Sequence, residues 1–422
     1  MKEPSAKYLA RPRYKRTELG LIPEDWEIKS VNQIGTPVRG GSPRPAGDPR
    51  YFDGSYIPWL TVAALTNIPA SQLVVTTTAS YLTEEGSQHS RTLLPGTLII
   101  ANSGATLGVA KILGIKCCAN DGIAALLHLS RNADPQYLAH FINTRTDYLR
   151  DVVATGNGQP NLNTELIGNL KLPMPPTKAE QQAIAEALTD ADSLIESLEQ
   201  LLTKKRQIKQ GAMQELLTGK KRLPGFSGEW EVRRLGDVAD TDPENLRSDT
   251  RPSFTFNYIA LEDVDVGTLN SYSEQVFRTA PSRARRLLRR HDVLVSTVRP
   301  NLMSHLLFAG DGDNWVCSTG FCVVRFREGV SHPRYVYFHM FAACVARQIE
   351  ALLTGSNYPA INGGDVRALR IPFPDYDEQA AIAAILSDMD GEIATLATKL
   401  AKAQLIKQGM MQELLTGRIR LV

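Results

Sequence analysis

The sequence predicts an α+β fold, in which two mixed α/β domains are separated and joined by two long antiparallel coiled-coil helices with an internal pseudo-two-fold repeat. Three observations carry this prediction. One segment occurs twice in the chain, each copy has apolar residues at heptad spacing, and short strand-like runs fill the residues before each copy. The length of 422 residues also favours two to three domains over a single core.

The repeated segment comprises residues 179–223 and 377–421, which align without gaps at a constant offset of 198. Because 25 of the 45 aligned residues are identical, chance does not explain the match. Each half of the chain also opens alike, with Trp26-Glu27 in the first half and Trp230-Glu231 in the second. We therefore expect a basic N-terminal segment, a first domain, a first helix, a second domain, a second helix and a short tail, at residues 1–23, 24–176, 177–218, 219–374, 375–417 and 418–422.

Apolar residues in each copy step by four and three alternately, which keeps them on one stripe of a helix. At about 40 residues, each helix is roughly 60 Å long. We expect the two stripes to pack against each other as a rigid spacer, although each helix packing on its own globular domain remains an alternative. The expected seam residues are Ile184, Leu188, Ile195, Leu198 and Leu202 in the first helix, and Ile382, Leu386, Met389, Ile393, Leu396 and Leu400 in the second.

The two domains have strand-like runs such as residues 97–100 and 292–295, each followed by a polar, turn-rich segment. Glycines allow close approach to a ligand, cations suit phosphates, and Asn, Gln or Arg side chains suit base edges, so several of these segments are candidates for nucleic-acid contact. An ordinary surface turn is the alternative for any one of them. The candidates are Arg39, Ser42, Arg44, Arg50, Tyr51, Asn102, Ser103, Thr106, Asn157 and Gln159 in the first domain, and Thr297, Arg299, Asn301, Ser356, Asn357 and Tyr358 in the second.

A dense run of arginines precedes the predicted strand at residue 292, and Arg283, Arg286 and Arg289 are its candidate DNA contacts. Such a cluster would neutralise several phosphates and give binding a strong salt dependence. The alternative is a solvated face whose charges serve no ligand.

The composition is that of a soluble globular protein, with 43% hydrophobic and 22% charged residues and a formal net charge of +2. No apolar run approaches the roughly 20 residues of a membrane helix, and the basic N-terminus lacks the apolar stretch of a secretory signal, so we expect a cytoplasmic protein without membrane contact. Five cysteines without a C-x-x-C spacing favour reduced thiols, and we expect no metal.

Three motifs together resemble the specificity (S) subunits of type I restriction-modification systems. They are the opening from Tyr14 to Trp26, the Gly41-Ser42-Pro43 and Ile57-Pro58-Trp59 that follow, and the paired helices that begin with Glu-Gln and end with Gln-Glu-Leu-Leu-Thr-Gly. The second domain departs from this pattern, because it lacks a clear copy of the Gly-Ser-Pro and Ile-Pro-Trp stretch.

The resemblance implies a non-catalytic subunit with two target-recognition domains, each reading one half of a bipartite, asymmetric site in double-stranded DNA. It implies that the helices set the gap between the half-sites. Two methyltransferase (M) subunits and restriction-translocase (R) subunits are the implied partners. The chain itself is expected to need no cofactor, with S-adenosylmethionine, ATP and Mg²⁺ on the partner subunits.

Other classes of protein explain less of the sequence. A methyltransferase needs an Asn/Asp-Pro-Pro-Tyr/Phe motif and a glycine-rich cofactor turn, and neither is present. A coiled-coil structural protein without DNA binding explains the helices, but not two diverged domains with polar loops at matching positions. A recognition subunit of a related multi-subunit restriction system remains open, because that difference lies in the partners.

Overall fold

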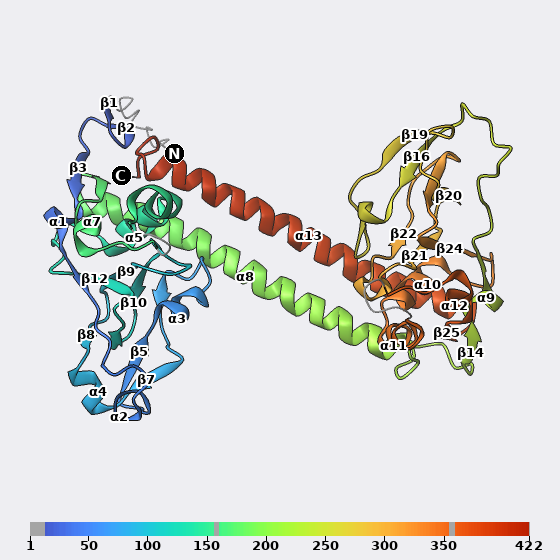
Figure 1. Cartoon of the computed structure of the whole chain (residues 1–422), viewed down its shortest axis with the longest axis horizontal. Helices are drawn as coiled ribbons and strands as arrows, with labels where there is room; N and C mark the ends of the chain where they lie inside the picture. Colours follow the sequence, from blue (N-terminus) through green and yellow to red (C-terminus); the bar gives the residue numbers. More distant parts are fainter. Residues whose placement is uncertain (1–12, 156–159, 354–358, 422) are drawn as a thin grey trace, which may run out of the picture. The chain divides into compact units, whose positions relative to one another are not determined.

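The computed structural model describes residues 13–155, 160–353 and 359–421, and the chain forms two compact units. Unit 1 comprises Met1–Leu201 and Ala397–Val422, whereas unit 2 comprises Leu202–Leu396. Two helices, α8 (Lys178–Leu216) and α13 (Tyr376–Leu414), each contribute one part to either unit (Figure 1). Each unit therefore contains one globular domain and parts of both long helices.

The domain of unit 1 contains a five-stranded sheet in the order β4-β12-β9-β10-β6 and a four-stranded sheet in the order β7-β5-β11-β8. The pair β13-β3 and the hairpin β1-β2 complete its strands. Their bounds are β1 (Tyr14–Thr17), β2 (Gly20–Pro23), β3 (Glu27–Ser30), β4 (Thr36–Arg39), β5 (Ile57–Leu60), β6 (Val74–Val75), β7 (Ser80–Leu82), β8 (Arg91–Leu93), β9 (Leu98–Ala101), β10 (Ala110–Leu113), β11 (Cys117–Ala119), β12 (Ile123–Leu127) and β13 (Lys171–Met174).

Among the described residues, the domain of unit 2 repeats the order of the two main sheets, except that its first sheet has no counterpart of β6. Its sheets run β15-β24-β21-β22 and β19-β16-β23-β20, with the pair β14-β25 and a small hairpin β17-β18. In both units one parallel pair, β5 with β11 and β16 with β23, lies in the second sheet. The bounds are β14 (Glu231–Arg234), β15 (Ala239–Thr241), β16 (Thr255–Ile259), β17 (Val264–Asp265), β18 (Thr268–Leu269), β19 (Ser273–Val276), β20 (Ala284–Leu287), β21 (Val293–Ser296), β22 (Leu306–Leu307), β23 (Trp315–Ser318), β24 (Phe321–Phe326) and β25 (Arg370–Phe373).

Short helices connect the strands of each domain. In unit 1 they are α1 (Val31–Ile34), α2 (Pro49–Phe52), α3 (Val62–Thr66), α4 (Glu84–Gln88), α5 (Pro135–Asn143), α6 (Thr146–Tyr148), the π-helix η1 (Leu149–Val153) and α7 (Thr164–Gly168). In unit 2 they are α9 (Leu235–Val238), the 3₁₀ helices η2 (Leu261–Asp263) and η3 (Pro300–Leu302), α10 (Pro333–Met340), α11 (Ala343–Leu352) and α12 (Gly363–Ala368).

The central strand of each first sheet is apolar on both faces, because both faces are covered. In β9, Leu98 and Ile100 face the core that includes α5 and the start of α8, while Ile99 and Ala101 face the core shared with the second sheet. Strand β21 divides in the same way between two cores. The strand-like runs predicted at residues 97–100 and 292–295 thus correspond to the inner strands β9 and β21, and the predicted fold class is confirmed.

Within each unit the two long helices lie antiparallel. In unit 1 the Lys407 Nζ donates to Asp192 Oδ1 at 2.5 Å, and in unit 2 the Lys209 Nζ donates to Asp390 Oδ1 at 2.5 Å. These two ion pairs are related by the repeat offset of 198. The side chain of Asp192 is 5% exposed and that of Asp390 is 42% exposed, so the unit 1 pair is the more enclosed.

The expected seam residues divide between two environments. Ile184 and Leu188 belong to the domain core of unit 1, and Ile382 and Leu386 belong to that of unit 2. The first turns of each helix therefore also pack on the domain that precedes it, as the alternative interpretation proposed. Further along, Ile195 and Leu202 are buried, whereas Leu198, Met389, Ile393, Leu396 and Leu400 are half-buried.

Candidate nucleic-acid interface

Four of the candidate residues in unit 1 meet at a single residue, Asp121, in the turn between β11 and β12. The Arg39 Nε and the Asn102 Nδ2 donate to its backbone oxygen at 2.6 and 3.2 Å. The Ser42 Oγ donates to its Oδ1 at 2.8 Å, and the Arg44 Nη2 to its Oδ2 at 3.3 Å. We call this group of Arg39, Ser42, Arg44, Asn102 and Asp121 the Asp121 junction.

Glycine makes the junction possible because two backbone segments approach closely. A side chain at Gly40 would place its Cβ 2.2 Å from the Asn120 oxygen and 2.5 Å from the Ala119 oxygen. The Gly40 and Gly41 amides instead donate to the backbone oxygens of Ile123 and Ala119 at 2.8 and 2.9 Å. The Gly-Gly step after β4 therefore brings Ser42 and Arg44 onto the turn that carries Asp121.

The loop after β9 forms the other side of the junction. Asn102 is 2% exposed, and its Oδ1 has no hydrogen-bond partner among the described residues. The Thr106 Oγ1 is likewise buried and unpartnered there. Ser103 forms an isolated β-bridge with Asn161, so the segment after residue 160 adjoins this loop. Asn157 and Gln159 lie outside the described residues.

Arg50 and Tyr51 lie in α2, away from the junction's hydrogen bonds. The Arg50 Nη2 donates to Asp48 Oδ2 at 2.7 Å, which lowers the pKa of Asp48 and raises that of Arg50. Tyr51 is 8% exposed, and its ring packs 5.1 Å from the His89 ring. The phenol side chain is thus mostly withdrawn from solvent.

Unit 2 builds the equivalent loop after β21 with different residues. The Thr297 Oγ1 donates to the Gly320 backbone oxygen at 2.7 Å, and Val298 forms a β-bridge with Ala360, as Ser103 does with Asn161 in unit 1. Arg299 has a left-handed backbone (φ 48°), and Asn301 is exposed on η3. Ser356, Asn357 and Tyr358 lie outside the described residues.

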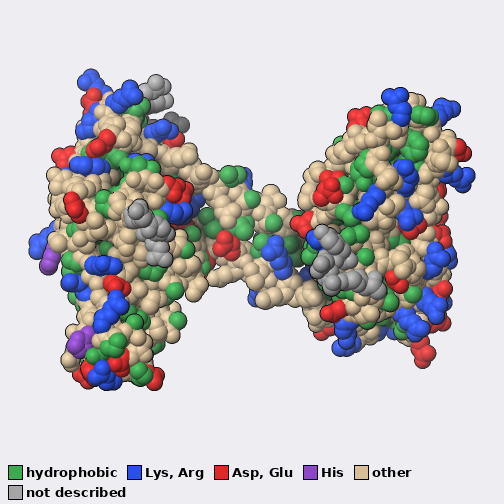
Figure 2. Space-filling model, in the orientation of Figure 1, with side chains coloured by type: hydrophobic (Ala, Val, Ile, Leu, Met, Phe, Trp, Pro, Cys, Tyr) green, Lys and Arg blue, Asp and Glu red, His purple; other side chains and the backbone are tan. Residues whose placement is uncertain are grey.

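The arginine cluster is largely matched with acidic side chains. The Arg286 Nη2 lies 3.0 Å from Asp242 Oδ2, and the Arg289 Nη2 lies 2.5 Å from Glu244 Oε1. Arg290 pairs with Asp311, and Arg283 is exposed. On the face that Figure 2 shows, basic and acidic side chains are interspersed over each unit. The cluster is therefore less cationic than its sequence indicates.

The Glu-Gln pair at the start of each long helix joins that helix to the domain before it. The Gln181 Oε1 accepts from the Asp134 amide at 2.8 Å, and the Gln379 Oε1 accepts from the His332 amide at 2.9 Å. Each contact fixes the loop that leads into α5 or α10. Sequence reasoning noticed the repeated Glu-Gln but did not assign it this role.

The glutamates of the same pairs bind arginines that follow the other long helix. In unit 1 the Arg420 Nη2 donates to Glu180 Oε2 at 2.8 Å and its Nη1 to Asp25 Oδ1 at 3.0 Å. In unit 2 the Arg222 Nε and Nη2 donate to the two Glu378 oxygens, each at 2.7 Å. Both glutamate side chains are 1% exposed.

Beside each of these ion pairs lies a tryptophan that opens a domain. The Arg420 guanidinium lies 5.8 Å from the Trp26 ring centroid, and that of Arg222 lies 5.5 Å from Trp230. The Trp230 Nε1 also donates to Glu378 Oε2 at 2.9 Å, whereas the Trp26 Nε1 has no partner among the described residues. In each unit, the duplicated segments thus bring together a glutamate, an arginine and a tryptophan, which join the long helices to the domain. We call these the closing contacts.

A buried polar group lies beneath the helices of unit 1. The Lys111 Nζ donates to the backbone oxygens of Pro69 and Gln72 at 2.8 and 2.6 Å, and burial lowers its pKa to about 8. Burial also lowers the pKa of His140, 3.3 Å from the Thr189 hydroxyl, to about 4. These residues support the packing of α5 and β10 on the helices and are not part of the Asp121 junction.

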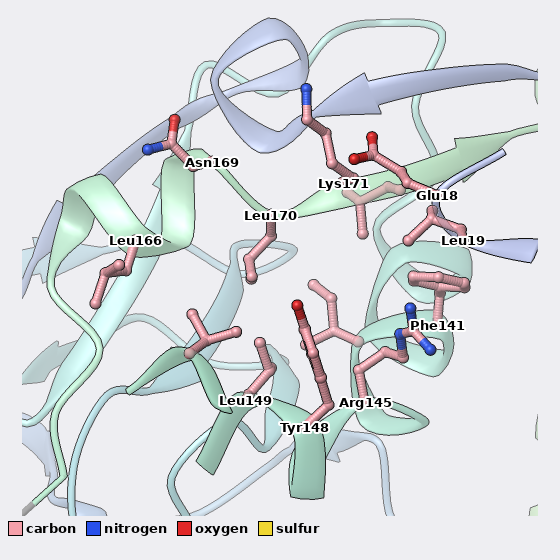
Figure 3. A pocket seen from close by; sticks show the side chains of 13 residues that line it. Glu18, Leu19, Phe141, Arg145, Tyr148, Leu149, Leu166, Asn169, Leu170 and Lys171 are labelled. Carbon is pink, nitrogen blue, oxygen red and sulfur yellow. The ribbon is translucent and has the colours of Figure 1, made fainter. Parts of the chain in front are cut away.

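A cavity of about 470 Å³ opens elsewhere in unit 1, between the β1-β2 hairpin, α5 with η1, and β13 (Figure 3). Leu170 points into it, and Glu18 and Lys171 lie at one side, opposite Arg145 and Tyr148. Its lining is mostly apolar and includes none of the junction residues.

Within the described ranges, no cluster of three or more His, Cys, Asp or Glu side chains could hold a metal ion. In the same ranges, no helix has the length and hydropathy needed to cross a membrane.

Comparison with known proteins defines the class. A family model for the type I restriction modification DNA specificity domain matches residues 23–210 and again residues 227–405. The chain is 23% identical over 421 residues to the specificity subunit of the type I restriction enzyme MjaVIII of Methanocaldococcus jannaschii, with 94% of each chain covered. It is 27% identical over 194 residues to the EcoR124I/EcoR124II specificity subunit of Escherichia coli, covering 44% of this chain and 45% of that one.

Solved structures agree at the level of the fold. The crystal structure of the type I restriction-modification system S subunit from M. genitalium matches with a TM-score of 0.61 at 13% identity, over 96% of this chain and 99% of that one. A chain from a structural study of complex assembly in the type I restriction-modification system matches with a TM-score of 0.54 at 18% identity, over 94% and 99% of the two chains. The chain belongs to the family of type I restriction-modification DNA specificity proteins, as its motifs predicted.

Proposed function

We propose that this specificity subunit reads a bipartite, asymmetric site in double-stranded DNA, with one domain on each half-site. The observation that carries the proposal is that the topologically equivalent strands β9 and β21 are followed by loops with different residues. The loop after β9 forms the bridge Ser103–Asn161, and the loop after β21 forms the bridge Val298–Ala360. A common frame with different side chains at its loops suits one docking task on two different sequences.

The second part of the proposal is that α8 and α13 set the gap between the half-sites. Each helix has 39 residues, or roughly 58 Å at 1.5 Å per residue. The duplicated ion pairs Lys407–Asp192 and Lys209–Asp390 support a fixed antiparallel register. A fixed register matters because about 10.5 base pairs make one turn of the duplex, so the gap also sets the rotational phase of the half-sites.

The chemistry belongs to partner subunits in this proposal. Two methyltransferase subunits and restriction-translocase subunits bind the chain and supply S-adenosylmethionine, ATP and Mg²⁺. The relatives support a place in such a complex, since one is a type I restriction enzyme specificity subunit and another comes from a structural study of complex assembly in the type I system.

A paired insertion tests the helix role. Seven residues of heptad-compatible sequence are inserted after Leu201 in α8 and after Leu396 in α13, where one unit passes into the other. This preserves the contacts within each unit and lengthens both helices by about 10 Å, or roughly three base pairs. Methylated sites are then mapped in DNA exposed to the variant with its methyltransferase subunits. We expect unchanged half-sites and a gap longer by about three base pairs.

Two further variants complete the experiment. Insertion in α8 alone is the matched control, because it breaks the register of Lys209 with Asp390 and should abolish defined spacing. A domain swap of residues 24–170 from another family member should alter one half-site only. An unchanged gap in the paired insertion, or a change in both half-sites after the swap, would contradict the proposal.

A further inference from the structure

The Asp121 carboxylate occupies an unusual position for a surface that meets DNA. Its side chain is 37% exposed and lies beside Arg44, whose side chain is 72% exposed. A carboxylate repels phosphate, so it is compatible with a DNA interface only where it meets a hydrogen-bond donor. The donors that DNA offers in the major groove are the exocyclic amines of cytosine and adenine.

The junction holds this carboxylate in a fixed place before any ligand arrives. The Ser42 hydroxyl and the Arg44 guanidinium each engage one carboxylate oxygen, and Arg39 and Asn102 hold the backbone oxygen of the same residue. An ionised carboxylate has about four lone-pair sites, so these two side-chain contacts leave acceptor capacity.

Charged donors stand directly beside this acceptor. In the described contacts Arg44 uses one N–H group toward Asp121 and Arg39 uses its Nε–H, so each guanidinium retains further N–H groups. An acceptor next to guanidinium donors is the complement of a G·C pair, which presents the O6 and N7 acceptors of guanine beside the N4 amine of cytosine. It fits an A·T pair less well, because adenine N7 and thymine O4 lie on opposite sides of the amine. The one guanidinium that contacts the carboxylate, that of Arg44, could then engage only one of these two acceptors, whereas it could engage both guanine acceptors.

Unit 2 lacks this arrangement. Gly320 stands where unit 1 has Gly122, since both accept the amide of the residue after the central strand, Thr297 or Asn102. The residue before it is Thr319 in unit 2 and Asp121 in unit 1. The acceptor is therefore a property of one domain.

We propose that Asp121 is a specificity-determining residue that accepts a hydrogen bond from the N4 amine of a cytosine, with Arg44 donating to the guanine of the same G·C pair. The inference rests on the proposed function and adds the base pair that the first domain selects. It predicts that one half-site contains an obligatory G·C pair.

The test combines site selection with base analogues. The full chain is used to select sites from a random duplex library, and its affinity for the selected site is measured by fluorescence anisotropy. Each cytosine of the half-site is then replaced by 2-pyrimidinone, which lacks the N4 amine. At one position we expect the wild type to lose on the order of tenfold in affinity. In Asp121→Ala and Asp121→Val, neither of which has a side-chain acceptor, we expect the same analogue to change affinity less than about twofold at that position.

This non-additivity separates base reading from a structural role, because a misplaced loop would weaken binding to both duplexes alike. The unchanged second half-site in the variants serves as the control for folding, and Thr319→Ala is the matched variant in the other domain. Equal losses in wild type and variants, or selected half-sites without an invariant G·C pair, overturn the inference alone. Failure of the wild type to select any bipartite sequence overturns the proposed function as well.

Discussion

The domains of units 1 and 2 have the same strand order and the same closing contacts, but they distribute charge differently around their loops. In unit 1 the cations follow the edge strand β4 and the carboxylate, Asp121, lies in the β11-β12 turn. In unit 2 the carboxylate, Asp242, follows the edge strand β15, accepts the Val323 amide at 2.9 Å, and pairs with Arg286 of β20. The strand order and the closing contacts are thus specified by residues that both repeats share. The loops differ, because the carboxylate lies in one loop of unit 1 and in a different loop of unit 2.

The largest difference in stability between the two units is expected when the buried glutamate of each unit, Glu180 or Glu378, is replaced. Replacing Glu378 by Ala leaves the Trp230 Nε1 without its acceptor, and leaves the Arg222 guanidinium with the Gly228 backbone oxygen but no carboxylate. It should lower the free energy of unfolding of unit 2 by about 3 kcal/mol. Glu180→Ala should cost unit 1 less, because Arg420 retains Asp25 and Trp26 loses no hydrogen bond. Hydrogen exchange resolved by mass spectrometry measures the two units separately. Glu231→Ala, at an exposed acid, is the control, and equal losses in both units would break the comparison.

The next largest difference in stability is expected from alanine substitutions of the glycines that follow the two long helices. Gly219 and Gly417 both have φ of 69°, so alanine costs each about 1 kcal/mol of backbone strain. A Cβ at Gly417 would also lie 2.5 Å from Pro23 Cγ, whereas at Gly219 the nearest atom is a Trp230 ring carbon at 3.1 Å. Gly417→Ala should therefore destabilise unit 1 by about 2 kcal/mol or more, beyond the effect of Gly219→Ala on unit 2. Urea unfolding gives the free energy of unfolding of both variants. A larger decrease in Gly219→Ala than in Gly417→Ala would contradict the prediction.

A buried histidine of unit 2 should make that unit the more sensitive to acid. Both ring nitrogens of His339 lack partners among the described residues, and burial lowers its pKa to about 3. Below pH 6.5 the unfolded chain binds a proton that the folded chain does not, so stability falls as the pH drops from about 6.5 toward 3.

Its counterpart at the repeat offset is Phe141, which suggests His339→Phe as the variant. From the pKa difference we expect this variant to lose about 2 kcal/mol less than the wild type between pH 7 and pH 5. Urea unfolding at the two pH values gives this difference. Parallel pH profiles for the two proteins would show that His339 does not carry the acid sensitivity.

The smallest effect on stability is expected in the arginine cluster. The side chains of Arg290 and Asp311 are 55% and 81% exposed, so Arg290→Ala should change stability by no more than about 0.5 kcal/mol. If Arg290 contacts a phosphate, the slope of log affinity against log salt falls by about one. Arg233→Ala, which removes a similarly exposed ion pair on β14, is the matched control. An unchanged slope would identify Arg290 as part of a solvated face.

The frame could be predicted from the sequence because its signals are local or repeated. The heptad stripe, the offset of 198 and the apolar runs at β9 and β21 each lie within one segment. The repeated Glu-Gln pairs are visible in the sequence, but their role in joining each helix to its domain is not. That role depends on contacts with Asp134 and His332, which lie 47 residues away in sequence.

The candidate interface was harder to predict because it depends on distant contacts. Arg39 and Asp121 are 82 residues apart in sequence, and Asn120-Asp121-Gly122 alone looks like any turn. The local run of arginines likewise left a DNA-binding cluster and a solvated face as alternatives, because the acids that match Arg289 and Arg290 lie 45 and 21 residues away in sequence. Tyr51 was chosen for its chemistry, and its burial against His89 depends on a helix packing that no local pattern shows.

Because Ala397–Val422 completes unit 1, the domain of unit 1 cannot be completed until the residues that follow the domain of unit 2 have been synthesised. Residues 202–396 must be synthesised in between, which takes on the order of 10 to 40 seconds at about 5 to 20 residues per second. During that interval Glu180 has left the ribosome while Arg420 has not, so a buried carboxylate lacks its cation. Nascent chains should therefore expose an incomplete unit 1 during this interval, and chaperone capture of truncated products should depend on residues 397–422.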